Sequence, residues 1–119
     1  MIKVQITAES DGDFRLNLDT TNIFDCSYKL QEENGDYNWS FYFHNIESIE
    51  NKIYYLFNEI KLSSTKDWII EEYKEKKRDY LKEIINNGLQ SSYEFFGGNQ
   101  SFIVDIYEIK HFDQFGNKY

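Results

Sequence analysis

The chain has 119 residues, a formal net charge of −8, ten Phe, ten Tyr, two Trp and no Pro. A chain of this length can build one core, and its aromatic content argues against disorder because buried rings remove much apolar surface from water. No stretch approaches the roughly 18 consecutive apolar residues that a membrane-spanning helix needs. The single cysteine, Cys26, permits no internal disulfide. We therefore expect one domain over residues 1–119, in a reducing, cytoplasmic compartment.

Alternating polarity predicts two N-terminal strands. Apolar residues occupy every second position over residues 2–7 and again over residues 14–18. Between them, Asp11-Gly12-Asp13 has the composition of a tight turn. We therefore expect these two strands to pair as a β-hairpin.

A second hairpin is predicted around Asn34-Gly35. Residues 24–31 alternate in polarity, and Asn-Gly suits the two positive-φ positions of a type I′ turn. The register reflected through that turn places apolar residues opposite one another on one face. The expected pairs are Leu30 with Trp39, Tyr28 with Phe41 and Cys26 with Phe43.

The hydrophobic period then changes from that of strands to that of helices. One amphipathic stripe predicts a first helix, and it consists of Ile46, Ile49, Ile53, Leu56, Phe57 and Ile60. A second helix is predicted to about Asn87, with Ser64 and Asp67 as a capping box and Gly88 as a left-handed stop. Its apolar stripe is Ile69, Tyr73, Tyr80 and Ile84, interrupted by Lys77.

Two further strands complete the predicted fold. They cover residues 92–96 and 102–109, joined by a turn at Gly97-Gly98-Asn99, and residues 111–119 have room for a short final strand. Residues 102–109 are apolar on both faces, which is typical of a central strand or of one that meets a partner. The order ββββααββ predicts an α+β fold, with an antiparallel sheet of five to six strands and two helices packed on one face.

No catalytic, metal-binding or cofactor pattern is present in the sequence. His44 and His111 have no zinc-ligand spacing, and Cys26 lies on an apolar strand face, where packing explains it. Residues 9–13 lack the acidic ladder of an EF-hand, and the glycines at 97–98 lack the lysine and helix of a phosphate loop. We therefore expect a protein that is not an enzyme and needs no cofactor or metal.

Direct nucleic-acid binding is also disfavoured. Domains that bind phosphates usually have a pI above about 9, whereas this chain has a pI near 4.7. The densest group of bases, residues 74–78, is interleaved with acidic residues on the predicted second helix.

The negative charge is concentrated in the first half of the chain. Residues 1–60 contain eleven Asp or Glu against four Lys or Arg, whereas residues 61–119 contain ten against nine. A solubilising role explains acidic residues in general, but this asymmetry also suits a basic partner, with acids steering association and exposed aromatics adding affinity. The candidate partner-binding residues are Asp11, Asp13, Asp19, Asp25, Glu32, Glu33, Asp36, Tyr37 and Tyr42, with Tyr54 and Tyr55 as further exposed aromatics.

In size and charge, the chain resembles bacterial immunity proteins that neutralise basic nuclease toxins. This resemblance implies a basic protein partner, a toxin domain or nuclease. No membrane partner is expected, because no apolar stretch is long enough to span a bilayer. A phage-encoded inhibitor of CRISPR or restriction nucleases that mimics nucleic acid is the first alternative. A small enzyme or structural domain is the second. If the acidic half is only solvated surface, the two-faced strand at 102–109 becomes the candidate interface.

Overall fold

The computed structural model describes residues 1–19, 26–97 and 100–108. The predictions for Phe24, Asp25, Gly98-Asn99, His111 and a final strand lie outside these ranges. In chain order the elements are β1 (Ile2–Glu9), β2 (Arg15–Leu18), β3 (Cys26–Glu33), β4 (Asp36–Phe43), α1 (Ile49–Glu59), β5 (Ile60–Ser63), α2 (Asp67–Asn87), β6 (Ser92–Phe96) and β7 (Ser101–Glu108).

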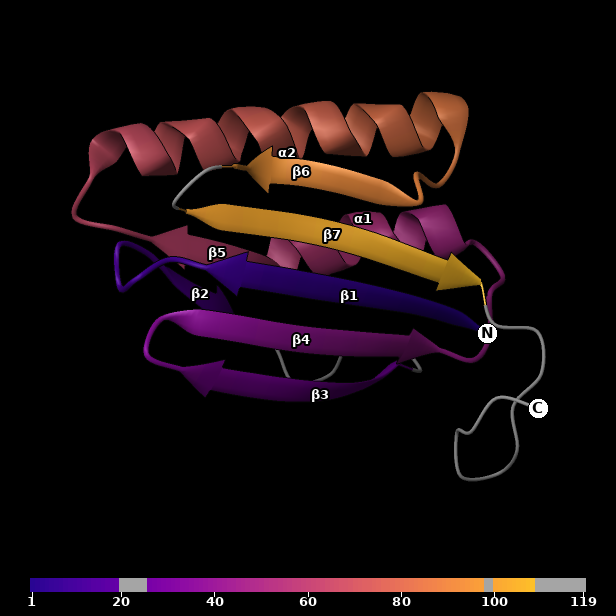
Figure 1. Ribbon diagram of the computed structural model, residues 1–119. Coiled ribbons are helices and arrows are strands. Elements are labelled where there is room, and N and C mark those ends of the chain that lie inside the picture. Colours follow the sequence, from indigo (N-terminus) through magenta and orange to yellow (C-terminus); the bar gives the residue numbers. More distant parts are fainter. Residues whose placement is uncertain (20–25, 98–99, 109–119) are drawn as a thin grey trace.

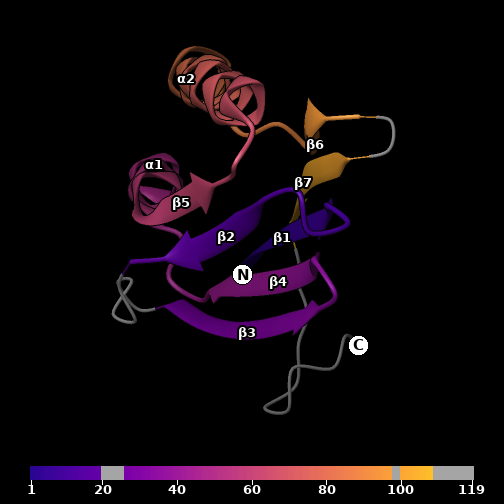
Figure 2. The same cartoon turned by 90° about the vertical axis from the view of Figure 1, so that its left-hand side faces the viewer.

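The predicted α+β class is confirmed. Five antiparallel strands form a sheet in the order β3-β4-β1-β7-β6, and β2 and β5 form a separate two-stranded sheet. Figure 1 shows this order from β3 to β6, and Figure 2 shows both helices and the β2–β5 pair on the same side of the larger sheet. None of the helices within the described residues is long and apolar enough to cross a membrane.

The predicted first hairpin is wrong, because β1 is the central strand of the sheet. Its residues Ile2–Glu9 pair with β4 on one side and with β7 on the other. Both hydrogen-bonding edges of β1 are therefore occupied, and β2 has no place beside it. Instead β2 pairs with β5, where Leu16 lies opposite Leu62.

The predicted second hairpin is confirmed in register and turn type. Cys26, Tyr28 and Leu30 lie opposite Phe43, Phe41 and Trp39. Asn34 has φ 52° and Gly35 has φ 86°, as a type I′ turn requires. The two strands differ in burial because β3 is the edge strand: Trp39 is buried, whereas Leu30 is 44% exposed.

Aromatic rings fill the space between the sheet and the helices. Phe95 of β6 stacks on Phe57 of α1 at 5.8 Å and on Phe102 of β7 at 4.6 Å, measured between ring centroids. The buried Tyr73 hydroxyl of α2 donates a 2.8 Å hydrogen bond to the carbonyl oxygen of Ile60. The residues that the sequence places in the core are all buried, and they are Trp39, Phe41, Phe43, Ile49, Ile53 and Phe57.

The helices differ from the prediction at several points. α1 ends at Glu59, so Ile60, which was predicted on its apolar stripe, instead begins β5, a strand between the helices that was not predicted. α1 begins at Ile49, after Ser48 at φ 55°, so Ile46 precedes the helix and is 48% exposed. The capping box at Ser64 does not form. The Ser64 hydroxyl instead donates to the backbone oxygen of Asp13 at 2.6 Å, and α2 begins only at Asp67. The predicted end of α2 before Gly88 is confirmed, but Gly88 has φ 83° and ψ −171°, which is not the left-handed helical conformation that was expected.

Replacing Phe41 by Ala is expected to reduce the free energy of unfolding by roughly 3–5 kcal/mol, because a fully buried ring leaves a cavity. The Phe41 ring has no exposed surface and lies 5.7 Å from Tyr28 and 6.0 Å from Trp39. Tyr42→Ala, on the opposite face of β4, is the control. Denaturant unfolding measures both, and a loss below about 1 kcal/mol for Phe41→Ala would contradict this packing.

Gly35→Val is expected to destabilise the protein more than Gly12→Val. Both glycines have positive φ, so both variants carry a backbone strain of about 1–3 kcal/mol. A Cβ at Gly35 would also lie 2.5 Å from the backbone nitrogen of Gly12, whereas a Cβ at Gly12 meets nothing within 4 Å. Equal losses of unfolding free energy in the two variants would show that the close approach of the two turns contributes nothing.

Candidate protein-binding site

One face of the five-stranded sheet is free of helices among the described residues. It carries the side chains of β1, β4 and β7 that alternate with the core residues, such as Lys3, Gln5 and Thr7 of β1. At one end of this face Lys3 lies between two aromatic rings, 5.8 Å from the centroid of Tyr42 and 5.7 Å from that of Tyr107. The other end is acidic.

Three carboxylates form a row across this acidic end. Glu9 of β1 lies opposite Asp36 of β4, and Asp36 lies opposite Glu33 of β3. Side chains directly opposite on one face are about 5 Å apart at Cβ, and like charges there are destabilising. All three residues are exposed, and none forms an ion pair with any residue that the structure describes. We call Glu9, Glu33 and Asp36 the acidic row.

A shallow hollow of about 640 Å³ lies at the acidic row. Its polar lining from the open face includes Thr7, Gln31 and Asn38 beside the three carboxylates. The Asn38 side-chain oxygen already accepts a 3.0 Å hydrogen bond from the Gln5 amide. Carboxylates and amide oxygens in this arrangement suit Lys or Arg side chains, because charge-assisted hydrogen bonds are the strongest that such groups make.

Two tight turns hold the acidic row in place. The turn at Asp11-Gly12 packs against the turn at Asn34-Gly35, and the Ser10 backbone N–H donates to the Gly35 carbonyl oxygen at 3.2 Å. The fully buried Ser10 hydroxyl lies 2.7 Å from the same oxygen and accepts a hydrogen bond from the Gly12 N–H at 3.2 Å. Exposed Asp11 is thereby placed at the same end of the sheet as the acidic row.

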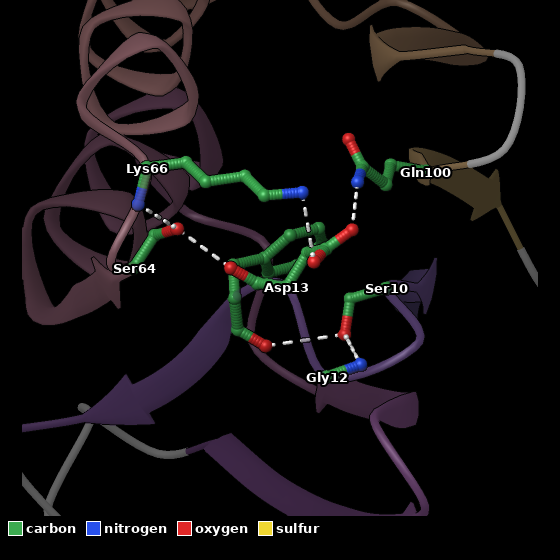
Figure 3. A network of polar contacts seen from close by, with 7 residues as sticks. Ser10, Gly12, Asp13, Ser64, Lys66 and Gln100 are labelled. Carbon is green, nitrogen blue, oxygen red and sulfur yellow. Dashed lines mark hydrogen bonds and ion pairs between the residues drawn. The ribbon is translucent and has the colours of Figure 1, made fainter.

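Asp13 and Glu32, which the sequence suggested as partner-binding acids, each have a cationic neighbour within the protein. Asp13 forms a 3.0 Å ion pair with Lys66 and accepts a hydrogen bond from the Gln100 amide (Figure 3). The contact with Lys66 holds the pKa of Asp13 below its usual value. These contacts join the β1–β2 turn to the segments before α2 and β7. Glu32 pairs with Arg15 at 3.1 Å.

The remaining predicted residues have different outcomes. Tyr37 is only 2% exposed and packs edge-on against Trp39, so its prediction as an exposed anchor is wrong. It faces the core because it lies two residues before Trp39 on the same face of β4, so the confirmed register itself places it inward. Tyr42 is half-buried on the open face, beside Lys3. Asp19 is exposed just after β2, where its backbone N–H donates a 3.0 Å hydrogen bond to the carbonyl oxygen of Glu59. Asp25 lies outside the described residues.

Sequence reasoning missed Glu9, which completes the acidic row. The sequence does indicate on which face of β1 Glu9 lies, because Glu9 falls on the polar side of the alternation that begins at Ile2. The sequence does not indicate which residues lie beside Glu9, since the β1–β4 pairing brings together Glu9 and Asp36, which are 27 positions apart. Gln31 and Asn38 were not named as site residues, although the predicted hairpin register already placed them opposite one another on the polar face.

Chemistry at the remaining candidate groups is limited. Burial raises the pKa of the Cys26 thiol to about 11, which keeps it protonated and a poor nucleophile near neutral pH. Among the described residues, no group of three or more His, Cys, Asp or Glu converges to hold a metal ion.

Asp36→Asn is expected to raise the free energy of unfolding by about 0.5 kcal/mol, because it removes the central charge from two like-charged cross-strand pairs. Asp79→Asn, which removes an exposed acid from α2, controls for the change in net charge. The gain should vanish in about 1 M salt, where the screening length is near 3 Å. Equal effects of the two substitutions in denaturant unfolding would show that the acidic row has no local repulsion.

No protein-family model, curated protein or solved structure matches this chain. What the acidic row binds is therefore inferred from its geometry and charge.

Proposed function

We propose that this protein is a cytoplasmic, non-enzymatic inhibitor that binds a basic protein through the acidic row, and that it serves as an immunity protein against a nuclease-type toxin. The observation that carries this proposal is the register of Glu9, Asp36 and Glu33, three carboxylates side by side without a cationic partner among the described residues. A basic partner supplies the missing charges. Binding then converts a repulsive cluster into a set of ion pairs.

A nuclease active site is a suitable target for such a surface. Nucleases bind phosphates with Lys and Arg, and carboxylates compete for the same groups. The acidic row lies on strands rather than on a long loop, and the packed turns at Gly12 and Gly35 fix its position. A preorganised surface loses little conformational entropy on binding, which favours a tight complex.

The alternative of a nucleic-acid mimic that blocks a phage-defence nuclease has less support. Mimicry of a phosphate backbone requires negative charge over an extended surface. On α2, however, Lys74, Lys77, Arg78 and Lys82 lie together beside a groove. These bases would repel the basic surface with which a nuclease binds DNA. The negative charge suited to such a surface is therefore confined to the end of the sheet.

The salt dependence of association tests the proposal. The partner is the toxin domain encoded by the adjacent gene, and association is followed by stopped-flow fluorescence across a salt series. The on-rate is expected to fall steeply with salt because exposed charges are screened within about 10 Å at 0.1 M ionic strength. Glu33→Lys combined with Asp36→Lys is expected to lower the on-rate at low salt by about tenfold or more.

The matched control is Glu75→Lys combined with Asp79→Lys, which changes the net charge equally at exposed sites on α2. This control should affect association much less. If both double variants slow association equally, only the net charge matters and the acidic row is not the interface. A salt-independent on-rate would contradict the proposal and favour the face of β7 around Ile103 and Tyr107 instead.

A further inference from the structure

A groove of about 370 Å³ is lined by α1 and α2. Figure 2 shows both helices on one side of the five-stranded sheet, and the acidic row belongs to the face on the other side. α1 contributes Tyr54 and Asn58. α2 contributes the remaining lining residues, which are Lys74, Lys77, Arg78, Leu81, Lys82 and Ile85. Four of the eight lining residues are basic and none is acidic, in a chain with 21 Asp or Glu against 13 Lys or Arg. The groove thus opposes the overall charge of the protein.

The helical period explains this separation of charge. In sequence, the bases of residues 74–82 alternate with acids, and α2 looks neutral. Residues three and four apart share a face, so Lys74, Lys77, Arg78 and Lys82 gather beside α1. Glu72 and Asp79 line other hollows, toward β6 and the C-terminal end of α2.

The bases of the groove have little internal neutralisation. Within the described residues, Lys74 is the base of the groove that forms an ion pair, with Glu71 at 3.7 Å. Both of these side chains are about two-thirds exposed or more. Lys77 packs over the ring of Tyr73 at 5.4 Å. Burial lowers the pKa of Lys77, and the charges of Lys61 and Lys74 lower it further. An anion in the groove would relieve this repulsion.

The groove also offers apolar contact. Ile85 is 62% exposed and Tyr54 is 39% exposed, while Leu81 between the helices is only 6% exposed and forms part of the floor. Burying apolar surface is favourable, so an occupant with an apolar side chain gains from covering both exposed residues. A ligand with charge alone would leave Ile85 and Tyr54 in water.

We propose that the α1–α2 groove binds a short acidic segment of another protein, whose apolar side chain packs on Tyr54 and Ile85 while its carboxylates face Lys74, Lys77 and Arg78. This interaction does not depend on the proposed function, because it uses a different surface and an occupant of opposite charge. A peptide fits better than a nucleic acid or an anionic membrane, since both are extended polyanions. Either would also meet the acidic residues that flank the groove on α2 and the net charge of −8.

Selection from a phage-displayed library of random twelve-residue peptides tests the proposal. The full chain is the bait, and the Arg78→Glu variant is used for counter-selection. Enriched peptides should combine Asp or Glu with Leu, Ile, Phe or Trp. A synthetic peptide of the consensus should shift the amide NMR signals of α1 and α2, including those of Tyr54 and Ile85. Fluorescence anisotropy then measures its affinity for each variant.

Arg78→Glu is expected to lower the affinity for the peptide by about tenfold. Ile85→Ser should lower it as well, because this substitution removes the apolar contact. Lys76→Glu is the matched control, since it makes the same charge change on the other side of α2 beside Glu72 and Glu94. Far-ultraviolet circular dichroism checks that each variant is folded.

Three results would overturn the proposal. One is the enrichment of peptides without acidic residues. Another is equal weakening by Lys76→Glu and Arg78→Glu, which would indicate nonspecific charge attraction. The last is tighter binding of a fifteen-residue oligothymidylate or of phosphatidylserine vesicles to the same residues, which would assign the groove to a different class of ligand.

Discussion

The arrangement of the whole protein depends on β1 being paired along both edges. Eight residues of this strand are in register with β4 on one side and with β7 on the other, so segments from both ends of the described chain are joined through it. Its alternate residues are fully buried, as Val4 and Ile6 are, which fixes the register because a slip by one residue would expose them. With both edges occupied, β2 must cross to the helical layer, and this displacement creates the second small sheet.

The sequence predicts the features that arise from local chemistry. The hairpin at Asn34-Gly35 follows from turn geometry and alternating polarity, and the end of α2 follows from a glycine that tolerates positive φ at position 88. The pairing of β1 with β7 does not follow, because it joins residues about a hundred positions apart and no local signal encodes it. The same limit applied to the site. Glu33 and Asp36 were found, but Glu9 becomes their neighbour only through the pairing of β1 with β4, which is also non-local. Asp13 and Glu32 receive cations that no local pattern placed beside them.

Charge in this molecule is arranged by register and by helical period rather than by composition. The acidic row exists because three strands end together, and the basic groove exists because residues of α2 separate onto different faces. Composition alone describes an acidic protein with one neutral half. The structure shows two compact regions of opposite sign, and each places like charges close together at some cost in stability. Such costs are common at binding surfaces, where a partner relieves them.

The two tryptophans occupy contrasting environments, and this gives the protein built-in optical reporters. Trp39 lies in the core with 1% of its surface exposed, between the rings of Tyr37 and Phe41, whereas Trp68 in the first turn of α2 is 57% exposed. The emission of a buried indole shifts to longer wavelength when the core opens, while that of an exposed one changes little. Fluorescence from Trp39 therefore reports on the integrity of the sheet, and quenching of Trp68 reports on the solvent at the start of the long helix. A single protein sample can thus distinguish loss of the core from local fraying of a helix end, without any attached dye.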